Sequence, residues 1–210
     1  LSALMTLMNC QRSAEDLEPA VESGRRALSG YRDLLGDQHP FTFACMVDVS
    51  IVLRLSGGLE EAQQLADDAA AGLSAALGDD HPYTLCARHA QANGLAAAGR
   101  HDEARAVDER ALERSRRARG EDHPYTLACA INLALDLDSL GDATSHTLRR
   151  ATLERIRRVL GAGHPDTGVS QLSMEEERRV PPRQVRMPRD DCEGDPVLVG
   201  CRRAHPSDQQ

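Results

Sequence analysis

The stretch that decides the fold is Gly78-Asp79-Asp80-His81-Pro82-Tyr83-Thr84. Three similar stretches occur in the chain, at residues 36–42 (GDQHPFT), 120–126 (GEDHPYT) and 161–167 (GAGHPDT). Their first residues are 42, 42 and 41 residues apart. Three columns of small residues keep the same 42-residue step, namely Gly57, Gly99 and Gly141, then Ala20, Ala62 and Ala104, then Ala27, Ala69 and Ala111. Such an internal period indicates an array of stacked structural units.

Each copy of the stretch is expected to end one helix and begin the next. Glycine can adopt the left-handed conformation beyond a helix end, and proline suits the first turn of a helix. Thr42, Thr84 and Thr126 follow the proline and are expected to act as N-cap residues. The glycine column at 57, 99 and 141 marks a short turn inside each unit. We therefore predict helices at 1–12, 15–35, 41–55, 59–77, 83–98, 102–119, 125–140 and 145–160.

The composition agrees with closely packed helices. Aromatic residues make up only 2% of the chain and Trp is absent, so the core must be built from Ala, Leu and Val. We predict an all-α fold, an α-α superhelix of about four helical hairpins and a short capping helix. The predicted units are 1–37, 38–79, 80–121 and 122–162, with the cap at 163–178. A Pro- and Arg-rich tail at 179–210 is expected to be disordered, although His205-Pro206 leaves a decayed fifth repeat open.

Charge and hydropathy restrict the kinds of partner. The net charge of -8 argues against nucleic acid, and no run of 18 apolar residues predicts a membrane span. All 25 basic residues are Arg, which suggests a GC-rich bacterial, actinobacterial-like genome. The chain begins at Leu1 inside a repeat, so we expect a fragment of a longer protein. Cys10, Cys45, Cys86 and Cys129 lie on apolar helical faces and are expected to be buried thiols in a reducing cytoplasm.

The pattern resembles the tetratricopeptide repeat, in its 42-residue kinesin light chain variety. The resemblance rests on the stretch at 78–84, on the run Gly99-Arg100-His101-Asp102-Glu103-Ala104 and on Asn132-Leu133-Ala134. It implies a cytoplasmic helical solenoid that binds a protein or peptide partner and is not an enzyme. The large residue that the family prefers in the middle of the second helix is replaced here by Gly24, Ala66 and Asp108.

The resemblance also implies a peptide-binding groove lined by the first helix of each hairpin. Carried over unit by unit, the groove positions are Asp48, Arg54, His89, Asn93, Asn132 and Asp138. Side-chain amides suit this role because each offers a donor and an acceptor to an extended peptide. Asn132 matches the family motif and is expected to face solvent. The alternative for each position is an ordinary solvated side chain.

Catalytic and metal chemistry is not expected. His39, His81, His123 and His164 recur with the period, but metal ligands must converge on one ion. Equivalent positions in stacked helices are about 10 Å apart, so we interpret these histidines as turn residues. The carboxylate pairs Glu60-Glu61 and Asp67-Asp68 fit a solvated helix face, and no nucleophile motif is present. The sequence predicts no cofactor and no metal site.

Two other roles remain open at this point. Bacterial proteins with such arrays resemble large regulators in which an NB-ARC-type nucleotide-binding domain precedes the repeats, and the array would then be a sensor or packing arm. These 210 residues contain no phosphate-binding loop of the GxxxxGK[ST] type. Self-association through the open end of the solenoid could accompany either role.

Overall fold

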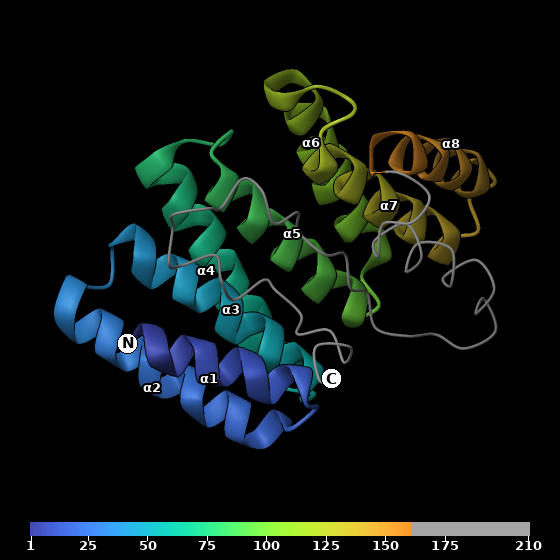
Figure 1. Ribbon diagram of the computed structural model, residues 1–210. Helices are drawn as coiled ribbons and strands as arrows, with labels where there is room; N and C mark the ends of the chain where they lie inside the picture. Colours follow the sequence, from blue (N-terminus) through green and yellow to red (C-terminus); the bar gives the residue numbers. More distant parts are fainter. Residues whose placement is uncertain (161–210) are drawn as a thin grey trace, which may run out of the picture. The chain divides into compact units, whose positions relative to one another are not determined.

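The computed structural model describes residues 1–160, which form eight helices and no strand (Figure 1). The helices are α1 (Ser2–Ser13), α2 (Leu17–Leu35), α3 (Pro40–Leu55), α4 (Leu59–Leu77), α5 (Pro82–Ala97), α6 (His101–Arg119), α7 (Pro124–Ser139) and α8 (Thr144–Leu160). Every predicted helix is present, and each end lies within two residues of its predicted place. The all-α fold is therefore confirmed, whereas the predicted cap at 163–178, the tail at 179–210 and His164 lie outside the described residues.

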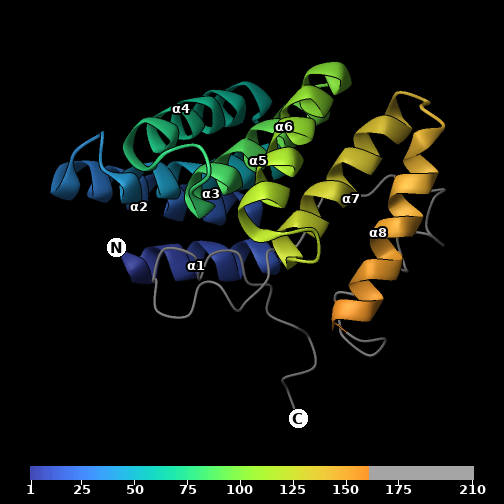
Figure 2. The ribbon, with the colours of Figure 1, turned by 90° about the horizontal axis from the view of Figure 1, so that it is seen from above.

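Residues 1–160 fall into two compact units that divide within α5. Unit 1 is Leu1–Gly94 and unit 2 continues from Leu95 to residue 160. In unit 1, α2 packs against α1 and α3, and α3 packs against α4 (Figures 1 and 2). In unit 2, α7 packs against α6 and α8. We call α1, α3, α5 and α7 the A helices and α2, α4, α6 and α8 the B helices. No helix among residues 1–160 has both the length and the hydropathy to span a membrane.

The histidine of the repeated stretch caps the A helix that follows it. His39 and His123 are the N-cap residues of α3 and α7, and each is followed by Pro at the first helical position. Because proline has no N–H, the first amide that needs an acceptor belongs to the next residue. The backbone N–H groups of Phe41 and Tyr125 donate to the histidine Nδ1 atoms over 3.1 Å. His81 accepts from the residue after its proline in the same way, at 3.2 Å.

The prediction that threonine caps these helices is therefore wrong. Thr42 and Thr84 lie inside the first turn and are fully buried. Their hydroxyls donate to the carbonyl oxygens of Gly36 and Gly78, at 2.8 and 2.7 Å. Both glycines have φ near +88°, the left-handed region that ends the preceding B helix. The threonine thus ties the start of an A helix to the end of the B helix before it.

The histidine cap gives the first prediction. His123→Ala removes the acceptor for the Tyr125 amide, so the free energy of unfolding should fall by about 1 kcal/mol. His123→Asn should restore most of the loss, because asparagine is a good N-cap residue. Urea denaturation of the two variants measures the effect. Equal loss in both variants would show that the ring stabilises the fold by packing and not by capping.

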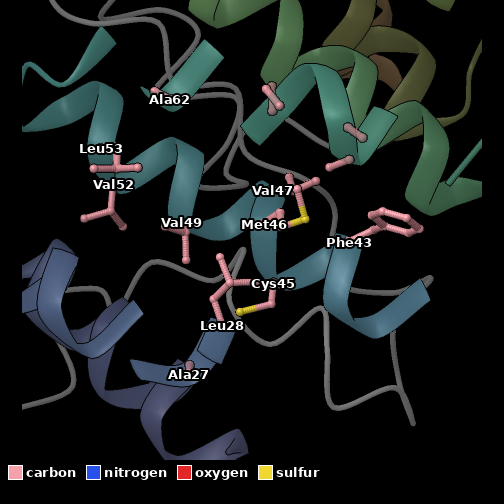
Figure 3. Close-up of a cluster of buried hydrophobic side chains, with 14 of the residues drawn as sticks. Ala27, Leu28, Phe43, Cys45, Met46, Val47, Val49, Val52, Leu53 and Ala62 are labelled. Carbon is pink, nitrogen blue, oxygen red and sulfur yellow. The ribbon is translucent and has the colours of Figure 1, made fainter. Parts of the chain in front are cut away.

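The repeated small residues lie where A and B helices approach one another. Ala20, Ala62 and Ala104 are at most 2% exposed, as expected from the repeat. Gly24 lies on α2 where a Cβ atom would come within 2.7 Å of the Met8 Sδ atom. Figure 3 shows the apolar cluster of unit 1, in which Ala27 and Leu28 of α2 face Cys45 and Val49 of α3. Small B-helix residues therefore let the larger A-helix side chains fill the core.

Candidate functional site

Asp48 and Arg54 of α3 share a charged environment with Arg12 of α1, all three within unit 1. Asp48 is only 5% exposed. Burial raises the pKa of its carboxyl to about 7, against the opposing attraction of the Arg12 guanidinium. Burial, and then the like charge of Arg12, lowers the pKa of Arg54. The guanidinium groups of Arg12 and Arg54 repel each other next to this buried carboxyl. Together they can bind an anionic or strongly polar group of a ligand.

Sequence reasoning missed Arg12, although the repeat could have indicated it. Arg12 precedes Arg54 by 42 residues, which is one repeat, so the two occupy the same position on successive A helices. Asp138 occupies this position two repeats after Arg54.

His89 and Asn93 lie on α5 in the part of that helix that belongs to unit 1. His89 is half-buried, whereas Asn93 is 7% exposed. The amide oxygen of Asn93 is buried and has no hydrogen-bond donor among residues 1–160. Asn9, two repeats earlier on α1, has the same property. Its Nδ2 atom donates to the Met5 carbonyl oxygen at 2.9 Å, but its Oδ1 atom has no donor among the described residues. Asn9 is a second residue that sequence reasoning missed.

The two predicted residues of unit 2 are Asn132 and Asp138, and Asn132 differs from the expected exposure. Asn132 of α7 is 0% exposed, so the expectation that it faces solvent is wrong. This position lies inside the hairpin stack, where neighbouring helices cover it. Asp138 is exposed at the end of α7 and is held from α8. The Asp138 carboxylate lies 3.4 Å from an Arg149 nitrogen and accepts from the Ser145 hydroxyl at 3.3 Å. Asp138 therefore links the two helices of its own hairpin.

The burial of Asn132 changes the effect expected from its mutation. Asn132→Ala should lower the free energy of unfolding by about 1–3 kcal/mol, because it removes a fully buried polar side chain. An exposed amide would change it by no more than about 0.5 kcal/mol. Thermal unfolding monitored by circular dichroism distinguishes the two values. Ser139→Ala, at the exposed end of the same helix, is the matched control and should leave stability nearly unchanged.

Other reactive side chains are accounted for by structure. The histidines His39, His81 and His123 hold the turns, as expected from their period. Residues 1–160 contain no group of three side chains placed to hold a metal ion. Cys45 and Cys129 are buried and Cys86 is half-buried, but Cys10 is exposed, so the prediction of burial is wrong for Cys10.

One carboxylate that we assigned to the solvated face is instead part of a polar seam. Asp67 of α4 is half-buried, and its Oδ1 atom accepts from the Gln63 amide at 2.7 Å and the Gln91 amide at 2.8 Å. Gln91 lies on α5, so this carboxylate helps to join α4 to α5 within unit 1. Glu60, Glu61 and Asp68 are exposed, as predicted.

Comparisons with known proteins agree with this architecture. Two sequence families, both described as tetratricopeptide repeat, match the chain, one at residues 83–145 and the other at 42–83 and 126–166. Two crystal structures from Podosopora anserina are similar in fold. Both contain nearly identical TPR-like repeats of a protein described as a kinesin light chain. One has a TM-score of 0.70 and 21% identity, and covers 83% of this chain and 82% of its own. The other has a TM-score of 0.69 and 21% identity, and covers 83% of both chains.

The comparison with curated proteins gives no match. The matched segments together run without a break from residue 42 to residue 166, which is more than half of the chain. They coincide with the 42-residue period and with the alternation of A and B helices. The chain belongs to the tetratricopeptide repeat family, whose helical arrays generally serve as scaffolds for protein–protein interaction.

Proposed function

We propose that the chain is a protein-binding scaffold that holds an extended peptide on the A-helix face of unit 1. Four of the six residues predicted for the groove, Asp48, Arg54, His89 and Asn93, belong to this unit. Asn132 and Asp138 belong to unit 2, where one is buried and the other bridges a hairpin. We therefore assign the peptide site to unit 1 and not to the six positions together.

The observation that carries the proposal is the group Arg12, Asp48 and Arg54. A buried carboxyl and a half-buried guanidinium with a like charge nearby both oppose folding. Neither is needed to stack helices, because the core of unit 1 is built from apolar and small residues. A ligand that brings a carboxylate to the two guanidinium groups would offset the repulsion between them. Such costs are typical of binding sites in otherwise stable folds.

Peptide selection tests this proposal. The full chain is used to select from a displayed library of random peptides of about 12 residues, since the partner is not known. We expect selected peptides to share an acidic residue. Arg54→Ala should weaken their binding about 10- to 100-fold, the effect of losing a charged hydrogen bond.

The matched control is Arg25→Ala. Arg25 lies on the B helix α2, is exposed and pairs with Glu61 at 2.6 Å. Removing it should leave peptide affinity unchanged. The proposal fails if no peptide is enriched, or if Arg25→Ala and Arg54→Ala weaken binding equally.

The remaining expectations about partners follow from charge and thiol chemistry. Residues 1–94 contain 6 Arg against 13 Asp and Glu, a net charge of -7, which disfavours nucleic acid as the ligand of unit 1.

Cys45 and Cys129 are buried thiols, and burial raises the pKa of each to about 12. Buried unreactive thiols suit a reducing compartment, so we propose the cytoplasm as the place of action.

A second contact is favoured by the outer face of α1. Leu7 is 47% exposed, although Val49, at the same position one repeat later, is fully buried. We propose that this face contacts another copy of the chain; in the alternative of a larger NB-ARC-type regulator, it would contact that protein. Sedimentation equilibrium separates these roles, because self-association predicts a dimer that Leu7→Asp abolishes. A monomer at every concentration would remove self-association.

A further inference from the structure

Asp48 is a buried carboxyl that the fold does not hold by a contact of its own. Its side chain is 5% exposed, and it makes no hydrogen bond or ion pair with any other residue among 1–160. A carboxylate in such a place is costly, because burial disfavours the charged form and no donor offsets the loss of water. A proton is the partner that removes this cost.

The repeat itself does not require a carboxyl at this position. Residues 42 apart occupy the same position on successive A helices, and the other three here are Thr6, Ala90 and Asn132. None of these three side chains ionises. The ionisable group is therefore particular to α3, which also carries Arg54. Helix stacking does not account for Asp48.

The charge that acts on Asp48 comes from α1. Arg12 attracts the ionised carboxyl, and Arg32 of α2 acts on the thiol of Cys45, one turn before Asp48 on α3. The half-buried ionisable side chains on the neighbouring part of α4 and α5 are Asp67, Cys86, Arg88 and His89. None of these four shifts the pKa of Asp48. Arg12 is thus the group whose state is tied to that of Asp48.

The protonation state of Asp48 decides what Arg12 and Arg54 can bind. An ionised Asp48 attracts Arg12 and repels a carboxylate that a ligand brings to the two guanidinium groups. A neutral Asp48 does neither, and its O–H can donate a hydrogen bond to the ligand carboxylate. The neutral form should therefore bind an anionic ligand more tightly than the ionised form.

We infer that unit 1 takes up a proton at Asp48 when it binds a ligand carboxylate between Arg12 and Arg54, so that its ligand is bound more tightly in acidic than in alkaline solution. This inference rests on the proposed function and specifies the regulation of the same site. The proton comes from the solvent and adds to a carboxylate oxygen of Asp48. The ligand carboxylate stays ionised, and no covalent bond forms or breaks.

The pKa of Asp48 sets the pH range of the effect. Burial raises this pKa to about 7 in the chain without ligand. About nine tenths of Asp48 is then protonated at pH 6, and about one tenth at pH 8. An apparent Kd is the intrinsic Kd divided by the fraction of the chain that is competent to bind. The Kd should therefore rise about 10-fold between pH 6 and pH 8.

Isothermal titration calorimetry of the full chain tests this inference. The probe is a peptide selected at pH 6 from the random library, acetylated at its N-terminus and free of histidine, so that no group of the probe titrates between pH 6 and pH 8. Titrations in two buffers of different ionisation enthalpy give the number of protons taken up. We expect about one proton per peptide at pH 8 and almost none at pH 6.

Asp48→Asn imitates the neutral carboxyl. This variant should bind the peptide at pH 8 about as tightly as the wild-type chain does at pH 6, and its binding should take up no proton. The matched control is Asp68→Asn, which makes the same chemical change at an exposed carboxylate of α4. It should keep the wild-type dependence of Kd on pH and the wild-type proton uptake.

Each other outcome overturns the inference. If the peptide binds with the same Kd at pH 6 and pH 8, or if Asp48→Asn still takes up a proton, the inference fails while peptide binding stands. Loss of binding in Asp48→Asn at both pH values would show that the ligand needs the ionised carboxylate, which also overturns it. If no peptide is selected at all, the proposed function fails and the inference fails with it.

Discussion

Asp48→Asn is expected to raise the free energy of unfolding by about 4 kcal/mol near pH 8 and to leave it almost unchanged near pH 4. The carboxyl of Asp48 has a pKa of about 7 in the folded chain, against 3.8 for an ordinary aspartate. The folded chain therefore binds more protons than the unfolded chain between these values. Stability falls as the pH rises through this window, because a buried carboxyl must ionise. Asparagine has the same shape and never ionises.

Urea denaturation at several pH values measures this difference. The matched control is Asp68→Asn on α4, where the carboxylate is exposed and the substitution should have little effect at any pH. A stability gain in Asp48→Asn that is the same near pH 4 and near pH 8 would contradict the account. It would mean that packing, and not ionisation, causes the gain.

Leu73→Ala is expected to lower the free energy of unfolding by about 2–5 kcal/mol. Leu73 of α4 is 0% exposed and belongs to the core cluster of unit 1. Truncation removes buried apolar surface and leaves a cavity that the closely packed helices can fill only in part. Unit 1 should lose stability together with its peptide affinity, because the A helices that carry the site rest on this core.

Leu34→Ala on α2 is the matched control for this prediction. It makes the same chemical change at a residue that is 71% exposed, so it should change stability by no more than about 0.5 kcal/mol. Chemical denaturation of both variants gives the comparison. Similar losses in the two variants would show that the apolar core of unit 1 has been placed on the wrong helix face.

The helices could be predicted closely because the signals that bound them are local. Glycine with positive φ ends α2, α4 and α6, and His-Pro begins α3, α5 and α7, so the period indicates these boundaries directly. The cap itself could not be assigned as easily. Threonine is the usual N-cap residue and histidine is not. Because proline has no N–H, the first amide that needs an acceptor lies two residues after the histidine. The histidine ring is the acceptor that this amide reaches.

The burial of polar side chains was less predictable. Asp48 and Asn132 occupy one position of the repeat, and both look like polar groove residues in the sequence. The structure buries them to 5% and 0% exposure. Their accessibility depends on how neighbouring helices cover an A helix from both sides, which a helical period does not describe. By contrast, Arg12 and Asn9 could have been found by subtracting whole repeats from Arg54 and Asn93.

The most direct test of the proposed binding face is an NMR titration of the full chain with a peptide selected from the random library. We expect the chemical-shift changes to concentrate on the A helices of unit 1, at Arg12, Asp48, Arg54, His89 and Asn93. The amides of the B helices α2 and α4 should change little. Shift changes confined to α2 and α4, or spread over unit 2 with none on α1 and α3, would contradict the assignment of the binding face.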